Sequence, residues 1–83
     1  MATTRRTFHD HLNAFCKDTG AYLQGAPDGP LSGLTFAAKD ILDIAGYVTG
    51  GGNPDWKETH PAADKTAWTV QTLVDAGATM AGK

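Results

Sequence analysis

The stretch GPLSGLTFAAKDILDIAG, residues 29–46, decides the fold. Its middle, residues 34–39, is short and mostly apolar, which predicts a buried β-strand. Side chains on a strand alternate between its two faces, so Lys39 would share a face with the small residues Thr35 and Ala37. Lys39 therefore stands at the carboxyl end of a predicted strand, the position at which ligands gather in open α/β sheets.

The residues around this strand predict a repeated alternation of helix and strand. Five Gly and Pro residues crowd residues 24–33, which predicts an ordered series of turns. Residues 65–76 predict a helix that Asp64 caps and Gly77 ends, followed by a strand over residues 78–81. This order indicates a parallel strand pair joined by a helical crossover, an α/β arrangement. The helix has an apolar stripe made of Ala67, Val70, Leu73 and Val74.

The remaining segments carry weaker patterns. Residues 4–19 predict an amphipathic helix that ends at Gly20, with an apolar face that includes Cys16 as an inert core thiol. Residues 47–53 form a loop with three successive glycines, and residues 54–63 predict an ordered but irregular stretch. The other apolar positions on the first helix are Phe8, Leu12 and Phe15.

Composition excludes several classes of function. The 83 residues carry seven Lys and Arg against nine Asp and Glu, with no basic patch, so nucleic acid is not an expected partner. No apolar run approaches the roughly 20 residues of a membrane helix, so we expect no membrane partner. A single cysteine forms no internal disulfide and favours a reducing compartment, which predicts a cytoplasmic location. One cysteine and three histidines make no metal-ligand set.

Two glycine motifs have a functional and a structural interpretation. Residues 77–83 read G-x-x-x-x-G-K, the beginning of a phosphate-binding loop and hence a nucleotide site. That site needs a strand before the first glycine and a helix after the lysine; the predicted order is the reverse, so a helix end followed by a strand is favoured. Residues 50–52 could cradle an anion through backbone amides, but a tightly packed or flexible loop is favoured.

The residues alone leave two alternatives open for Lys39. Its ammonium either extends to solvent at the strand end or is held in a pocket. A buried lysine loses its charge more easily than one in water, and a neutral amine serves as a general base. Asp40 would point to the opposite side of the strand, so it is not an automatic ion-pair partner for Lys39.

Residues 29–46 resemble the N-terminal block of the amidase signature enzymes, G-P-L-x-G-x-P/T-F-x-x-K-D-x-x-D-x-x-G. Residues 75–83 are similar to the helix end and strand that follow in this family. Residues 49–56, TGGGNPDW, look most like the branch of plant-type indoleacetamide hydrolases. The resemblance covers about residues 29–83.

The resemblance implies a fold, a chemistry and a site. The fold would be the N-terminal part of the amidase signature fold, a mixed sheet covered by helices, incomplete in this chain. Residues 1–83 would form one N-terminal fragment: a leading helix and turn segment over 1–28, and a strand-loop-helix-strand unit over 29–83. The family cleaves amides with a serine nucleophile, a second serine in a cis peptide, and a lysine base without a cofactor; Lys39 matches that lysine. Both serines lie downstream in the family, and Ser32, in a turn, is not a candidate.

Two functions remain as expectations. The first is a piece of an amidase for a small amide such as indole-3-acetamide, inactive until the remainder of the domain completes the fold. The alternative is a non-catalytic, amidase-like binding or receptor module; the presence of Lys39 favours the enzyme. Because a two-stranded sheet exposes both edges, we also expect the isolated chain to be unstable or prone to aggregate.

Overall fold

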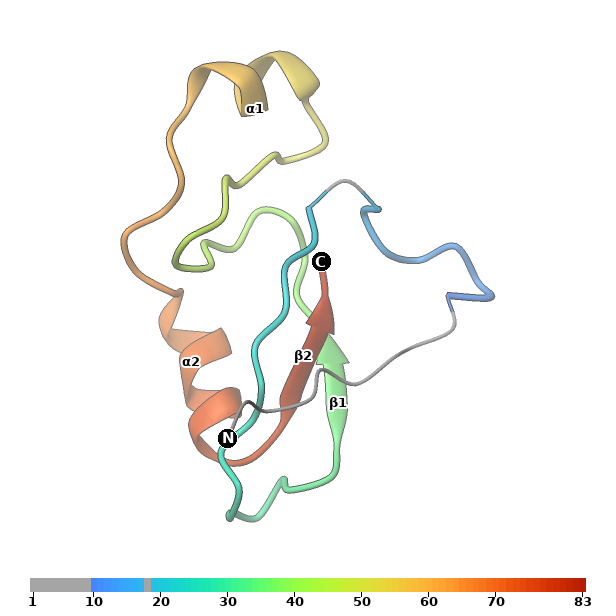
Figure 1. Cartoon of the computed structure of the whole chain (residues 1–83), viewed down its shortest axis with the longest axis vertical. Coiled ribbons are helices and arrows are strands. Elements are labelled where there is room, and N and C mark those ends of the chain that lie inside the picture. Colours follow the sequence, from blue (N-terminus) through green and yellow to red (C-terminus); the bar gives the residue numbers. More distant parts are fainter. Residues whose placement is uncertain (1–9, 18) are drawn as a thin grey trace.

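The computed structural model describes residues 10–17 and 19–83, and its centre is a pair of parallel strands with one helix packed on their face. A second, shorter helix lies away from the strands at one end (Figure 1). The predicted parallel pair with a helical crossover is therefore confirmed. The elements are, in chain order, β1 (Thr35–Ala37), α1 (Pro54–Thr59), α2 (Trp68–Asp75) and β2 (Thr79–Gly82).

The ladder between the two strands contains one irregularity. Phe36 of β1 pairs with Met80 of β2, but the next pair joins Ala37 to Gly82, so Ala81 has no partner across the ladder. Pairing continues beyond β1, since Ala38 donates its N–H to the Gly82 carbonyl at 3.0 Å. Such a bulge changes the direction of the side chains that follow it.

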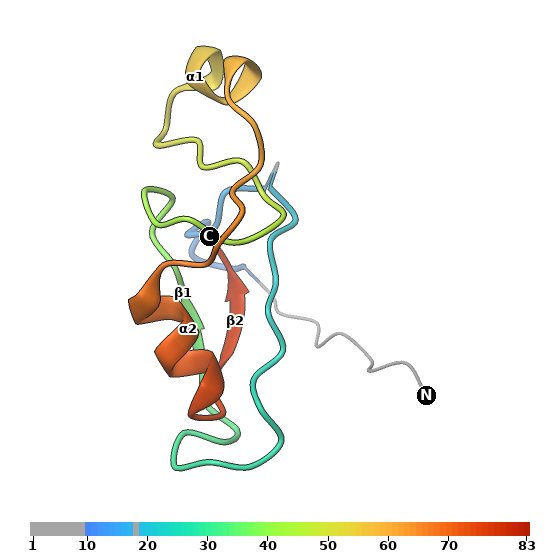
Figure 2. The same ribbon diagram turned by 90° about the vertical axis from the view of Figure 1, so that its left-hand side faces the viewer.

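A third extended segment covers the other edge of β2. Leu23 and Met80 exchange two backbone hydrogen bonds, of 3.1 and 2.9 Å, as an antiparallel bridge. Gly25 donates to the Thr79 hydroxyl at 3.0 Å. Residues 20–28 run beside β2 in both views (Figures 1 and 2). The expectation that both edges of the pair are open is therefore wrong for β2, because this bridge covers its outer edge. The sequence before β1 has no strand pattern that would predict the bridge.

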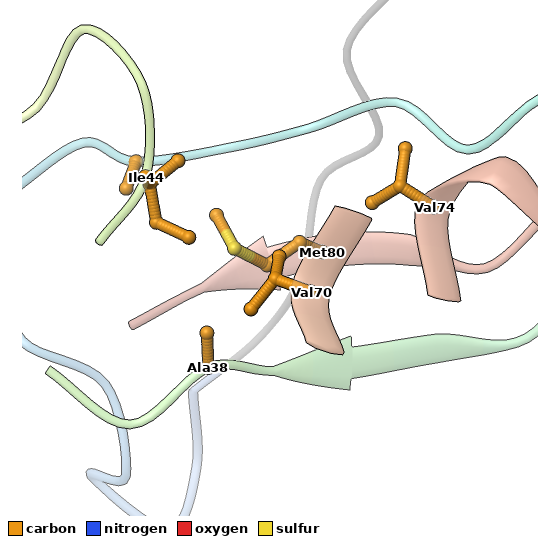
Figure 3. Close-up of a cluster of buried hydrophobic side chains, with 6 residues drawn as sticks. Ala38, Ile44, Val70, Val74 and Met80 are labelled. Carbon is orange, nitrogen blue, oxygen red and sulfur yellow. The ribbon is translucent and has the colours of Figure 1, made fainter. Parts of the chain in front are cut away.

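The core lies between α2 and the strands. Ile44, Val70 and Met80 are its largest fully buried side chains. Figure 3 shows Val70 of α2 and Met80 of β2 beside one another, with Ala38 and Ile44 close by. Burying each large apolar side chain stabilises the fold by about 1.5–3 kcal/mol. Of the predicted stripe, Val70 and Val74 are buried and Ala67 packs against the cluster, whereas the half-buried Leu73 lies outside it.

Gly77 ends α2, as predicted. It has a φ of +108°, which residues with a side chain rarely adopt, and a Cβ there would lie 2.8 Å from the Ser32 nitrogen. Glycine therefore lets the chain turn sharply from α2 into β2 while the residues before β1 pack against it. Because a helix precedes Gly77 and a strand follows it, the G-x-x-x-x-G-K motif lacks the geometry of a phosphate-binding loop.

The N-terminal prediction is wrong where the structure describes it. Residues 10–17 and 19 form turns and bends rather than a helix; residues 4–9 and 18 of the predicted helix lie outside the described part. The Asp10 carboxylate accepts the N–H groups of Ala14 and Phe15 at 2.7 and 3.2 Å, and it thereby replaces the backbone acceptors of a helix. Cys16 is exposed, so it is not a core thiol.

The region predicted to be irregular, residues 54–63, contains α1 instead. The Asn53 side chain accepts the N–H groups of Asp55 and Trp56 at 3.0 and 3.2 Å, and Pro54 occupies the first turn. An Asn cap followed by proline is a helix-start signal, and the absence of an apolar stripe concealed it.

The helix α2 begins later than predicted. Its N-cap is Ala67, which makes no side-chain capping bond, so the predicted cap at Asp64 is wrong. The Ala67 N–H is already donated to the Asp43 carbonyl at 2.7 Å, which fixes the entry of the chain into the helix. At eight residues, α2 is far too short to cross a bilayer, and no other helix in the described ranges is long and apolar enough to do so.

Candidate functional site

The carboxyl ends of β1 and β2 lie at the same end of the molecule and bring three features together. Lys39 and Asp40 follow β1, and Lys83 follows β2. The loop that carries Gly50 folds back onto this end. Figure 1 shows the end of β2 beside the chain that leaves β1. Charged residues therefore gather at the carboxyl ends of these parallel strands, the edge at which ligands bind in open α/β sheets.

Lys39 itself is exposed in this chain. Its backbone carbonyl accepts the Leu42 N–H at 3.0 Å, so the turn after β1 begins at this residue. In this chain the Lys39 side chain therefore extends to solvent and is not held in a pocket. β1 ends at Ala37, so strand alternation does not set the direction of the Asp40 side chain, which pairs with Lys83 instead.

The buried lysine of this site is Lys83, which was not predicted from the sequence to be a site residue. Its side chain is 0% exposed, and its Nζ lies 2.8 Å from Oδ1 of Asp40, whose side chain is 13% exposed. The sequence does indicate a strand-end position for Lys83, because this residue follows an apolar strand just as Lys39 does. Removing one partner of a buried ion pair costs about 3–5 kcal/mol, because the other charge stays unpaired.

The pair is held by charge rather than by a well-aligned hydrogen bond. The Lys83 ammonium is close enough to Asp40 to donate, but it has no partner that satisfies hydrogen-bond angles in the described part of the chain. Coulomb attraction between the two charges at 2.8 Å does not require this alignment.

Asp40 also binds the glycine loop. Its Oδ1 accepts the Gly50 N–H at 3.2 Å, and its backbone carbonyl accepts the Gly51 N–H at 2.8 Å. Gly50 is buried, and a Cβ there would lie 2.7 Å from Oδ2 of Asp40. The loop is therefore packed closely at Gly50, whose amide binds a carboxylate of the chain itself, whereas Gly51 and Gly52 are exposed.

Three hollows surround this end of the molecule. One of about 200 Å³ is lined by Asp40 and Gly50 among others. Two more, of about 300 and 310 Å³, share Thr49 and Trp56 as lining residues. Trp56 stacks on His60, with ring centroids 3.5 Å apart and planes 11° apart. The two hollows that Trp56 lines offer an aromatic ring to a ligand, whereas the smaller one is lined by charged and small residues, including Asp40 and Lys57.

The other chemical groups do not complete a catalytic set. Ser32 lies before the amino end of β1, the end opposite to Lys39, and donates its hydroxyl to the Pro27 carbonyl at 3.4 Å. Within residues 10–17 and 19–83, no group of three His, Cys, Asp or Glu side chains is placed to hold a metal ion.

Three curated relatives show what the chain is similar to. Outer envelope protein 64, chloroplastic, of Arabidopsis thaliana is 61% identical over 54 residues, which cover 65% of this chain and 9% of the relative. Amidase 1 of the same plant is 49% identical over 74 aligned residues, which cover 78% of this chain and 17% of the relative. An amidase of Pseudomonas putida is 36% identical over 74 residues, covering 89% and 15%.

These similarities concern a small part of each relative. The chain spans 9–17% of the length of these three proteins. No protein-family model matches the chain, and no solved structure matches it significantly.

Proposed function

Because the chain belongs to the amidase signature family, we propose that it supplies the lysine base of an amide hydrolase and that Lys39 is this base. The observation that carries the proposal is the Lys39-Asp40 sequence at the carboxyl end of β1, within the block that resembles the family. Reactive groups in α/β folds gather at such strand ends.

The chemistry of Lys39 is proton transfer. Its neutral amine would take a proton through a bridging serine and thereby activate the serine nucleophile that attacks the amide carbonyl. An amine acts as a base only when uncharged, which for a lysine requires removal from water. Lys39 is exposed in this chain, so the proposal requires further polypeptide that covers it and brings the two serines.

We propose a small amide as the substrate, with indole-3-acetamide as the first compound to test. The support is the similarity of residues 49–56 to the indoleacetamide hydrolase branch. Trp56, within that stretch, is 52% exposed and lines two of the hollows near Asp40. An aromatic amide would gain offset-stacking energy from such a ring.

The alternative is a non-catalytic binding or receptor module. The observation in its favour is the 61% identity to a relative named as an outer envelope protein rather than as an amidase. In such a module Lys39 would be a solvated surface residue, as it is in this chain.

A chimera separates these functions. Residues 29–83 would replace the matching segment of Amidase 1 from Arabidopsis thaliana, and hydrolysis of indole-3-acetamide would be followed by released ammonia. If Lys39 is the base, Lys39→Ala lowers kcat by about 100-fold or more. Lys39→Arg lowers it similarly, because an arginine keeps its charge and does not accept a proton.

Lys65→Ala is the matched control, since Lys65 is also exposed but lies outside the block of residues 29–46 that resembles the family. It should leave kcat unchanged. Full activity of Lys39→Ala would reject the base assignment. A chimera that melts as cooperatively as Amidase 1 but shows no hydrolysis with Lys39 intact would favour the binding module.

We also propose a cytoplasmic location. Cys16 is a free, exposed cysteine, which persists most readily in a reducing compartment. Fractionation of cells that express the tagged protein tests this, and recovery in an organelle membrane fraction would contradict it.

A further inference from the structure

We propose that the buried Asp40–Lys83 ion pair is a positioning element for Lys39, fixing the backbone from which the lysine side chain extends. The inference rests on the function proposed for Lys39. It adds Asp40 and Lys83 to the site as residues that act by positioning Lys39. It concerns an arrangement at the ends of β1 and β2, where the Asp40 carboxylate and the Lys83 ammonium lie 2.8 Å apart.

The first argument is the energetic cost of the pair. The Lys83 side chain is completely removed from water, and Asp40 is nearly so. A buried ion pair is often no more stabilising than apolar side chains of the same volume, because both charges lose their hydration. Stability alone therefore gives no reason for a lysine at this position. A buried pair can instead hold two segments in a defined arrangement, which is the role we assign to it here.

The second argument is what the pair connects. Asp40 makes three contacts. Its carboxylate pairs with Lys83 after β2 and accepts the Gly50 N–H, and its backbone carbonyl accepts the Gly51 N–H. Residue 40 is thus anchored to the end of β2 and to the glycine loop at once. Because Asp40 follows Lys39 directly, these contacts restrain the peptide on the carboxyl side of the lysine.

The third argument is that the other side of Lys39 is restrained as well. The Ala38 N–H is donated to the Gly82 carbonyl at 3.0 Å, one residue before Lys83. The carbonyl of Lys39 accepts the Leu42 N–H at 3.0 Å. The backbone of Lys39 is therefore held on both sides, while its side chain is exposed to solvent. A misplacement of about 1 Å at a reacting group can reduce the rate by about 100-fold.

The key variant is the double substitution Asp40→Asn with Lys83→Met. It removes one negative and one positive charge, so the net charge is unchanged and neither charge is left buried alone. In the chimera with Amidase 1, we expect kcat for indole-3-acetamide to fall about 10-fold or more, with KM within about threefold of the parent value. A purely structural role would leave kcat unchanged at temperatures at which the variant is folded.

Amide hydrogen exchange in the same chimera, extended to carry residues 20–83, gives a readout that does not depend on activity. In the double variant, amide hydrogen exchange should become about 10-fold faster at Ala38, Gly50 and Gly51. The matched control is the Ala26 N–H, donated to the Val74 carbonyl at 2.9 Å on the far side of β2; its exchange should not change.

The outcomes separate the two proposals. Faster exchange at those three amides together with a lower kcat supports the positioning role. Unchanged exchange, or an unchanged kcat in a folded double variant, overturns it. Retained activity in Lys39→Ala instead overturns the base assignment, which the double variant does not test. If the double variant fails to fold, Gly50→Ala replaces it, because its Cβ would press on the Asp40 carboxylate and displace the same anchor.

Discussion

The two helices of this chain are stabilised in opposite ways. The helix α2 buries Val70 and Val74 against the strands, yet its N-cap Ala67 makes no capping bond. The helix α1 buries none of its residues, and the Asn53 side chain caps it with two hydrogen bonds. Figures 1 and 2 show α2 on the face of the strands and α1 well apart from them. One helix thus depends on tertiary packing, the other on local polar contacts.

This difference has a general physical reason. A helix of six or eight residues is too short to be stable by its own backbone hydrogen bonds in water. It persists only if a buried face or a cap compensates for the lost chain entropy. Burial links a helix to the rest of the fold, so α2 should unfold with the whole chain. A cap acts within one turn, so α1 should open by itself.

The largest effect should follow from loss of burial in α2. Val70→Ala removes two methyl groups from a side chain that is only 1% exposed. We expect a loss of about 2–3 kcal/mol in the free energy of unfolding, from the transfer of about 0.8 kcal/mol per methyl group plus a cavity. Urea denaturation followed by circular dichroism measures it. Thr69→Ala on the exposed side of α2 is the control, and an equal loss in both variants would refute the role of burial.

A smaller and local effect should follow from loss of the cap on α1. Asn53→Ala removes the acceptor for the Asp55 and Trp56 N–H groups, worth about 0.5–2 kcal/mol of helix stability. Amide exchange should become faster at these two residues and stay unchanged in α2. Asn53→Gly, which costs only a few tenths of a kcal/mol, is the matched control. A fall in global stability as large as that of Val70→Ala would show that α1 is not independent.

The smallest effect concerns the turn at Asp10, which resembles α1 in relying on a side chain that binds backbone amides. The hydrogen bond from the Ala14 N–H holds the pKa of Asp10 below its usual value; partial desolvation opposes this, and Phe15 and Lys17 assist. A lowered carboxyl pKa stabilises the folded turn above about pH 3.9, and the contribution disappears as the pH falls through the lowered value.

NMR titration of the Asp10 side-chain carbon tests this prediction. The midpoint should lie below about 3.9 and should remain there at high salt, because a hydrogen bond from Ala14 rather than the Lys17 charge is the leading cause. A midpoint at or above the usual value would show that the turn does not form in solution.

The contrast between the helices also explains what could be predicted from the sequence. The strand at residues 35–37, the stripe on α2 and its end at Gly77 were predicted, because apolar periodicity and glycine report burial and backbone geometry directly. The helix α1 was not predicted, because only its cap Asn53 and the following Pro54 indicate that a helix begins there. The predicted helix over residues 4–19 failed from residue 10 onward, because the Asp10 side chain competes for backbone N–H groups that periodicity does not consider.

The surroundings of Lys39 were predicted only in part. The strand whose carboxyl end precedes Lys39 followed from the sequence. The partnership of Asp40 with Lys83 did not, because it joins residues 43 positions apart through a strand register that a single sequence does not specify. The role of Lys39 stays a prediction.

The unpaired Ala81 in β2 has a consequence for how this end of the molecule can vary. An uninterrupted ladder would set residue 83 level with residue 39; the skipped residue sets it level with residue 38 instead. A single-residue insertion or deletion in β2 would therefore relocate a positive charge relative to Lys39 without altering any side chain. Protein engineers who lengthen or shorten this strand would be changing its electrostatics as well as its length.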